Sequence, residues 1–266
     1  MTTNYFTQED HAALKQSSSA AARHDLQPVC DKLCELHATL HRRMRDRQWD
    51  LHPHWQKSKL ICTETAASTF ECSSLVLPYA RSKDQAELVE RLMGRDGAEL
   101  PSTVDIRRHP VIELRLMPDH FAVELVMSPM SWWDQQNLIG KLAVSRHRSA
   151  LHSLLQKIDG DFLFGFWGGS GLNEMHLSSR QLSRAVIFDE WMSTFAEGRD
   201  WLRFGVWYEP EDPALSVNNI LSELLHRMSA LYSIYTFALW TSNNNFQSFY
   251  KSARTYTNGR DHHNRL

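Results

Sequence analysis

The chain has 266 residues, of which 42% are hydrophobic and 23% are charged, and its formal net charge is -2. This composition suits a globular protein with enough apolar material for one large core, and it excludes an intrinsically disordered chain. A charge so close to zero provides no general attraction to nucleic acid or to an anionic membrane, so we expect no strong nucleic-acid binding.

The N-terminal region begins with a short helix, for which Thr7 and Asp10 have the spacing of a capping box. Small polar residues follow, and we expect residues 1–24 to be a mobile segment. A longer helix is predicted over residues 25–48, where apolar residues recur on one stripe. That stripe comprises Leu26, Val29, Leu33, Leu36, Leu40 and Met44.

Two strands are expected next, at residues 59–63 and 71–79, from their β-branched and apolar residues. Ser82 and Gln85 then have the spacing of a second capping box, which predicts a helix that Gly94 ends. Residues 95–108 lack periodicity and are interpreted as a loop.

A β-hairpin over residues 109–127 is the clearest element, because apolar side chains alternate on both of its strands. The turn centres on Pro118 and Asp119. Either a two-residue or a four-residue loop would pair Leu116 with Phe121, and the same register would continue along both strands, giving one apolar face. A three-residue loop would place Leu114 opposite Glu124 and is less favourable.

On the other face of the hairpin, this register places Glu113 directly opposite Glu124, with Arg115 beside them and His109 farther upstream. Like charges directly opposite one another are unfavourable. An arginine bridge, a bound cation or a proton shared for acid-base chemistry could relieve the repulsion. These four residues are the candidate site, and the structural ion pair is the favoured interpretation.

After the hairpin, Ser131 and Asp134 are expected to cap one long helix, and residues 162–167 form a strand. A helix at 179–195, a strand at 200–208 and a helix at 216–240 follow. The last helix is apolar nearly all round at Ile234, Phe237 and Trp240, which indicates a central or interface position.

The order of these elements predicts an α+β fold, a mostly antiparallel sheet packed by several long amphipathic helices, in a single domain over residues 25–255. Residues 256–266 are expected to be a polar tail.

Four residues with metal-ligand chemistry, Cys30, Cys34, His37 and His41, lie along one predicted helix. They span about 16 Å of helix rise and cannot meet at one tetrahedral ion, so we expect no metal and no cofactor. The other cysteines, Cys62 and Cys72, also lie in periodic segments. The N-terminus has no export signal, and therefore reduced thiols and a cytoplasmic protein are predicted.

Two further patterns bear on partners. The arginines at residues 42–47 lie near Trp49 and Trp55, as cations and aromatics do on surfaces that bind single strands, but cations also stabilise a helix C-terminus. We favour the solvated helix end. The most apolar run, residues 230–240, is far shorter than the ~20 residues of a membrane helix, so no membrane span is expected.

The phrases RHPVIELRL, SWWDQQNLIGKL, RDWLRFGVWYEPEDPAL and LWTSNNNF resemble a family of uncharacterised bacterial conserved hypothetical proteins. The resemblance covers residues 42–250. It implies a bacterial origin and a single-domain family, and it implies no activity, so no catalytic residue is transferred from it.

The sequence contains no motif tied to a reaction and leaves open whether the protein is an enzyme. The leading hypothesis is a non-catalytic binding or regulatory protein, a homo-oligomer acting through an aromatic-rich surface; no small-molecule ligand is indicated. The alternative is a hydrolase-like enzyme that uses the carboxylates of Glu113 and Glu124 with His109 and Arg115.

Overall fold

The structure, a computed structural model, describes residues 3–15, 26–55, 61–62, 74–94, 104–166 and 176–245. The strands in these ranges form an antiparallel sheet in the order β1-β3-β4-β5-β8-β6-β7, and β2 also pairs with β3. The strands are β1 (His52–Pro53), β2 (Ile61–Cys62), β3 (Ser74–Ala80), β4 (Val111–Leu116), β5 (Phe121–Met127), β6 (Leu163–Gly165), β7 (Leu177–Ser178) and β8 (Leu202–Tyr208). Together with the helices they confirm the predicted α+β fold.

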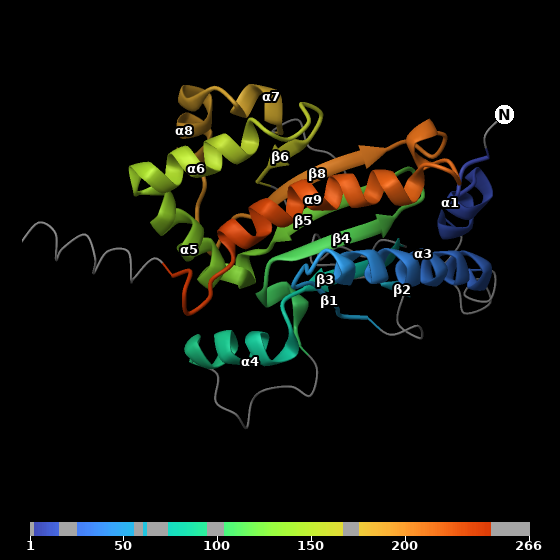
Figure 1. Cartoon of the computed structure of the whole chain (residues 1–266), viewed down its shortest axis with the longest axis horizontal. Coiled ribbons are helices and arrows are strands. Elements are labelled where there is room, and N and C mark those ends of the chain that lie inside the picture. Colours follow the sequence, from blue (N-terminus) through green and yellow to red (C-terminus); the bar gives the residue numbers. More distant parts are fainter. Residues whose placement is uncertain are drawn as a thin grey trace, which may run out of the picture.

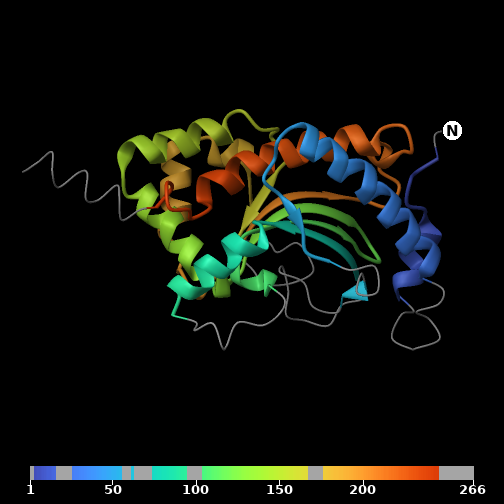
Figure 2. The ribbon, with the colours of Figure 1, turned by 60° about the horizontal axis from the view of Figure 1, so that its bottom comes forward.

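Helices cover one face and one end of this sheet. Figures 1 and 2 show α3 and α9 lying across the same face of the sheet, with α5, α6, α7 and α8 gathered beyond one end. The helices are α1 (Gln8–Lys15), α3 (Gln27–Asp46), α4 (Lys83–Leu92), α5 (Trp132–Leu142), α6 (Ser145–Leu155), α7 (Ser179–Leu182), α8 (Ala185–Ser193) and α9 (Ile220–Ala238).

The core lies between the sheet and the pair formed by α3 and α9. The register predicted for the hairpin is confirmed, with Leu116 opposite Phe121 and Leu114 opposite Val123. The apolar residues of this face are buried, as is the apolar stripe of α3 from Val29 to Met44. Apolar residues therefore recur every second position on the strands and about every 3.6 positions on α3, and these two apolar sides pack on one another. The burial of this apolar surface drives folding.

The second apolar side of α9 is covered from within the chain by α5. Ile234 is buried, and Phe237 and Trp240 are half-buried. The indole of Trp133 on α5 lies 6.0 Å from that of Trp240, and the Lys141 ammonium lies 4.4 Å from the Phe237 ring centroid. The sequence predicted a central or interface position for this helix, and these contacts place it inside the fold.

Local capping agrees with the sequence in two places. Thr7 and Asp10 cap each other, since the Thr7 amide donates to the Asp10 carboxylate and the Asp10 amide donates to the Thr7 hydroxyl. The Ser82 hydroxyl accepts from the Gln85 amide, but the Gln85 side chain donates to Asp50. The capping box predicted at Ser82 and Gln85 is therefore only half formed. Gly94, just beyond α4, has a φ of 87°, which suits glycine.

Three predicted helices differ in extent. The single helix after Ser131 is two helices, α5 and α6, because the chain is extended at Val144, and this bend lets α6 bury Leu151 and Leu155. The helix expected at 179–195 likewise divides into α7 and α8. The last helix begins at Ile220 and not directly after Ser216, since Ser216 forms a β-bridge with Asn4.

The ends of the chain are described in part. In the segment predicted to be mobile, residues 3–15 include α1, and Phe6 and Leu14 lie in the core. The rest of that segment and the predicted tail at 256–266 lie outside the described residues. Within the described part of the chain, no helix combines the length and apolar character of a membrane span.

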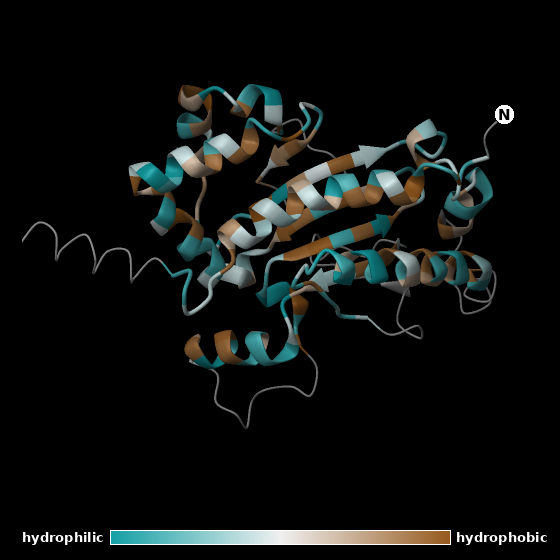
Figure 3. Ribbon diagram, in the orientation of Figure 1, coloured by the Kyte–Doolittle hydropathy of each residue, from teal (hydrophilic) through white to brown (hydrophobic). Residues whose placement is uncertain are grey.

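A small apolar patch lies apart from the core on α4. Leu88 and Leu92, one turn apart on this helix, are 49% and 47% exposed. Figure 3 shows the hydrophobic colour of this helix at some distance from the sheet.

Candidate functional site

The predicted site lies on the face of the sheet opposite α3 and α9. We call it the Glu124 cluster, and it comprises Glu113, Glu124, Arg115 and Arg203. Glu113 on β4 lies opposite Glu124 on β5, as the hairpin register predicted. All four residues are fully buried.

The carboxylate of Glu124 is held by two arginines. Arg203 on β8 donates from Nε to Oε2 at 2.8 Å and from Nη2 to Oε1 at 2.8 Å, in the bidentate arrangement that guanidinium and carboxylate groups favour. Arg115 on β4 also donates from Nη2 to Oε1. Both oxygens of Glu124 are thus occupied by protein donors from the two neighbouring strands.

Sequence reasoning identified Glu113, Arg115 and Glu124 but missed Arg203. The first three lie on one hairpin, whose register follows from local alternation. Arg203 joins them through the pairing of β5 with β8, which are separated by more than 70 residues. The repulsion between Glu113 and Glu124 indicated an arginine bridge from Arg115, but no local signal in the chain pointed to Arg203 as a second partner.

Gly205 makes the approach of β8 possible. It lies opposite Glu124, and a Cβ atom at this position would come within 2.4 Å of the Val123 carbonyl oxygen and 2.6 Å of the Glu124 Cβ atom. Glycine within a strand often marks such a close backbone approach. The absence of a side chain here lets Glu124 lie against β8, where Arg203 reaches it.

Electrostatics keep Glu124 ionised. Burial alone would raise its pKa, but the charges of Arg115 and Arg203 and the hydrogen bonds from Arg203 outweigh burial and lower the pKa below its ordinary value. A general acid near neutral pH needs the opposite shift. The cluster therefore has the electrostatics of a buried ion pair.

His109 does not join the Glu124 cluster. It precedes β4, and its Nε2 lies 3.4 Å from a carboxylate oxygen of Glu90 on α4. Burial lowers the pKa of His109 and favours the neutral imidazole, and the hydrogen bond that His109 donates to Glu90 only partly offsets this effect. Arg81 and Asp134 are the next charged groups around it.

The second buried polar group closes the end of α9, and sequence reasoning missed it. Asp134 on α5 accepts from the Trp240 amide at 2.6 Å and from Arg81. Asn137 donates to the Ala238 carbonyl at 3.0 Å, and Lys141 donates to the Phe237 carbonyl. The residues of α5 thus satisfy backbone groups that the helix end would leave unpaired. Asp134 had been expected to cap α5 itself.

In the ranges that the structure describes, no three His, Cys, Asp or Glu side chains are arranged to hold a metal ion. His37 and His41 stack on each other, and the Nδ1 atom of His37 lies 2.8 Å from the Tyr79 hydroxyl. Burial lowers the pKa of His37 to about 4, so its ring is neutral at pH 7.

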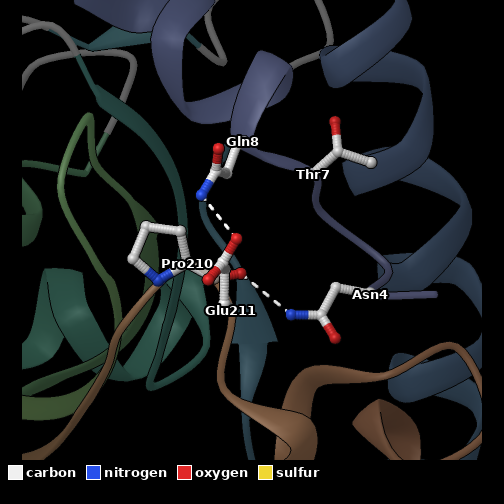
Figure 4. Close-up of a pocket in the computed structure, with 5 residues that line it drawn as sticks. All are labelled: Asn4, Thr7, Gln8, Pro210 and Glu211. Carbon is white, nitrogen blue, oxygen red and sulfur yellow. Dashed lines mark hydrogen bonds between the residues drawn. The ribbon is translucent and has the colours of Figure 1, made fainter. Parts of the chain in front are cut away.

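Two hollows on the described surface differ in their lining. One, of about 300 Å³, is lined by Asn4, Thr7, Gln8, Pro210 and Glu211. These residues are drawn in Figure 4. The Glu211 carboxylate accepts from Gln8 at 2.5 Å, and the Asn4 amide donates to the Pro210 carbonyl at 2.9 Å. A second hollow, of about 270 Å³, is mainly apolar and lies between α5, α6 and α8.

The fold and these sites define an α+β protein with two buried polar clusters. A comparison with models of known protein families gave no match, and neither did a comparison with curated proteins. The resemblance to a bacterial family remains an expectation from the sequence.

Proposed function

We propose that this chain is a binding or regulatory protein that acts through its surface, and that Glu113 and Glu124 stabilise the sheet. The observation that carries the proposal is the environment of Glu124. Its two oxygens are occupied by Arg115 and Arg203, and no part of the carboxylate is exposed. A catalytic carboxylate has to reach a substrate or a water molecule.

An aromatic-rich surface near α8 supports the binding role. Phe166 stacks on Trp191 at 4.1 Å between ring centroids and lies 4.9 Å from Phe195, and all three rings are half-buried. The apolar hollow lined by Phe188 and Met192 lies on the same helix. Tryptophan and other aromatic residues contribute much of the binding energy at protein interfaces. We expect this surface to contact apolar side chains of a partner protein.

The alternative is a hydrolase-like enzyme that uses Glu113 and Glu124 with His109 and Arg115. It would require a path from solvent to Glu124 and a carboxyl with a raised pKa. The buried position and lowered pKa of Glu124, together with the contact of His109 with Glu90, support the structural role instead.

Origin and compartment complete the proposal. We propose a cytoplasmic bacterial protein without a cofactor. Among the described residues, Cys30 and Cys34 form no disulfide, which suits a reducing compartment. The bacterial origin rests on the resemblance described above.

The paired substitution Glu113→Gln/Glu124→Gln tests the proposal. If the carboxylates serve to balance Arg115 and Arg203, their loss leaves two buried cations without counter-charge, and the free energy of unfolding falls by about 3 kcal/mol or more. Urea denaturation of the wild type and the variant measures the difference. A gain in stability would show that the carboxylates repel one another without compensation, as residues kept for chemistry do, and would overturn the structural role.

A further inference from the structure

The exposed side of α3 carries a charge pattern that neither buried cluster uses. Asp31, Glu35, Ala38, Arg42 and Arg45 are all exposed. At 100° per residue they fall within about 80° of one another around the helix, on the side opposite the buried stripe. We call these five residues the α3 stripe. It is acidic in its first half, basic in its second half and small at its centre.

The α3 stripe is complementary to itself when two copies lie antiparallel. Ala38 lies seven residues from both Asp31 and Arg45, and it lies between Glu35 and Arg42. A two-fold axis at Ala38 therefore places Asp31 opposite Arg45. It also brings Glu35 to within one residue, about 1.5 Å of helix rise, of the position opposite Arg42. Each pair occurs twice. Ala38 faces its own copy, where a small side chain lets two helices approach closely. Such self-complementarity is what a two-fold interface requires.

The position of α3 leaves the stripe accessible. Figures 1 and 2 show α3 on the outside of the molecule, with the sheet beneath it and α9 at its side. Among the described residues, Arg42 and Arg45 form no ion pair with an acidic side chain. Asp31 accepts a hydrogen bond from Gln27, which is itself on the surface. No described element packs over these side chains.

Stabilisation of the helix dipole does not account for this pattern. That effect is confined to the first and last turns. The first turn of α3 has no acidic residue, since Asp31 and Glu35 begin one turn farther on, and Arg42 precedes the last turn. Arg45 lies in the last turn, so the dipole accounts for this residue but not for the other three charges. Asp31 and Glu35 are also spaced i, i+4, where like charges destabilise an isolated helix. A partner that brings Arg42 and Arg45 against them removes this repulsion.

We propose that a second copy of this chain binds the α3 stripe, forming a symmetric dimer through antiparallel α3 helices. The proposal goes beyond the proposed function, since it adds a second surface, away from the aromatic residues near α8, through which two copies of the chain assemble. Helices of this length, about 30 Å, give a contact at the lower end of interface sizes, held by four charge pairs. The dimer is therefore of moderate affinity and weakens with salt.

Charge reversal tests the register of this dimer. Sedimentation equilibrium at low salt should show the 30.9 kDa wild type reaching twice its monomer mass at high concentration. Asp31→Arg/Glu35→Arg and Arg42→Glu/Arg45→Glu should each stay monomeric, with dissociation constants raised about tenfold or more. An equimolar mixture of the two should form a heterodimer. The variant that carries all four substitutions exchanges the acidic and basic halves of the stripe and should dimerise again.

A matched control reverses charges elsewhere. Lys83→Glu/Arg91→Glu changes two exposed cations on α4 and should leave the wild-type dimer intact. A wild type that stays monomeric, a control that dissociates, or a fourfold variant that fails to associate while the wild type dimerises would each overturn the proposal. None of these results alters the unfolding test at Glu113 and Glu124, so the two proposals fail separately.

Discussion

Two glutamates in regular elements of this chain have opposite surroundings. Glu124 on β5 is fully buried and bound by Arg115 and Arg203, whereas Glu35 on α3 is exposed to solvent. The same side chain is part of the internal structure in one region and part of the surface in the other. The comparison shows that the role of a charge here depends on which strand or helix is packed beside it.

The largest effect expected from this contrast is at Glu124. Glu124→Gln removes the carboxylate that both Arg115 and Arg203 bind inside the sheet and should lower the free energy of unfolding by about 3–5 kcal/mol. Glu35→Gln is the matched control and should change it by less than about 0.5 kcal/mol. Urea denaturation of both variants provides the values. Equal losses at the two positions would remove the distinction between them.

The close approach at Gly205 provides a sharper test of the same cluster. Gly205→Ala forces a Cβ atom against the β5 backbone, so the strands must shift and the free energy of unfolding should fall by about 1–3 kcal/mol or more. Gly160 is the control, since it has no positive φ and an added Cβ there meets only the flexible side chain of Arg180, at 3.1 Å. An unchanged stability for Gly205→Ala would show that β8 does not need this approach.

Lys141 extends the comparison to pH. Burial lowers its pKa from 10.5 to about 8, so between pH 8 and 10.5 the unfolded chain holds a proton that the folded protein has released. Stability from this residue therefore rises with pH across that window. Relative to Lys141→Met, the wild type should gain about 1–3 kcal/mol between pH 8 and pH 10.5, measured by urea denaturation. If the difference in stability between the wild type and Lys141→Met does not change with pH, the pKa of Lys141 is not lowered in the folded protein.

Two buried tyrosines give the smallest expected effects. The hydroxyl of Tyr79 lies 2.8 Å from His37 Nδ1, whereas the buried hydroxyl of Tyr235 has no hydrogen-bond partner among the described residues. Tyr79→Phe should cost about 1 kcal/mol, and Tyr235→Phe should be neutral or slightly stabilising. Thermal unfolding of the two variants shows which one loses more stability. A larger loss for Tyr235→Phe would contradict the hydrogen-bond partners given above for the two hydroxyls.

Local patterns in the sequence predicted much of this structure. The alternation in the hairpin was enough to place Glu113 opposite Glu124, and the apolar stripe of α3 was enough to identify its buried side. Both follow from spacing along one element.

The remainder of the site depends on contacts between distant parts of the chain. Arg203 reaches Glu124 through the pairing of β8 with β5, and Asp134 binds the end of α9 and not its own helix. His109 lies outside β4 and contacts α4. The spacing of residues along one element carries no information on such contacts. The sequence therefore indicated the opposed glutamates and Arg115, but not Arg203 or the contacts of Asp134 and His109.

The protonation state of Glu124 tests the structural role most directly. Carbon-13 NMR of the Glu124 carboxyl, followed from pH 7 downwards in protein labelled on glutamate, reports its pKa in the folded state. We expect the signal to remain that of a carboxylate below pH 4.5, because Arg115 and Arg203 lower its pKa. Protonation of this carboxyl above pH 4.5 would contradict the structural ion pair and would favour a role in acid-base chemistry.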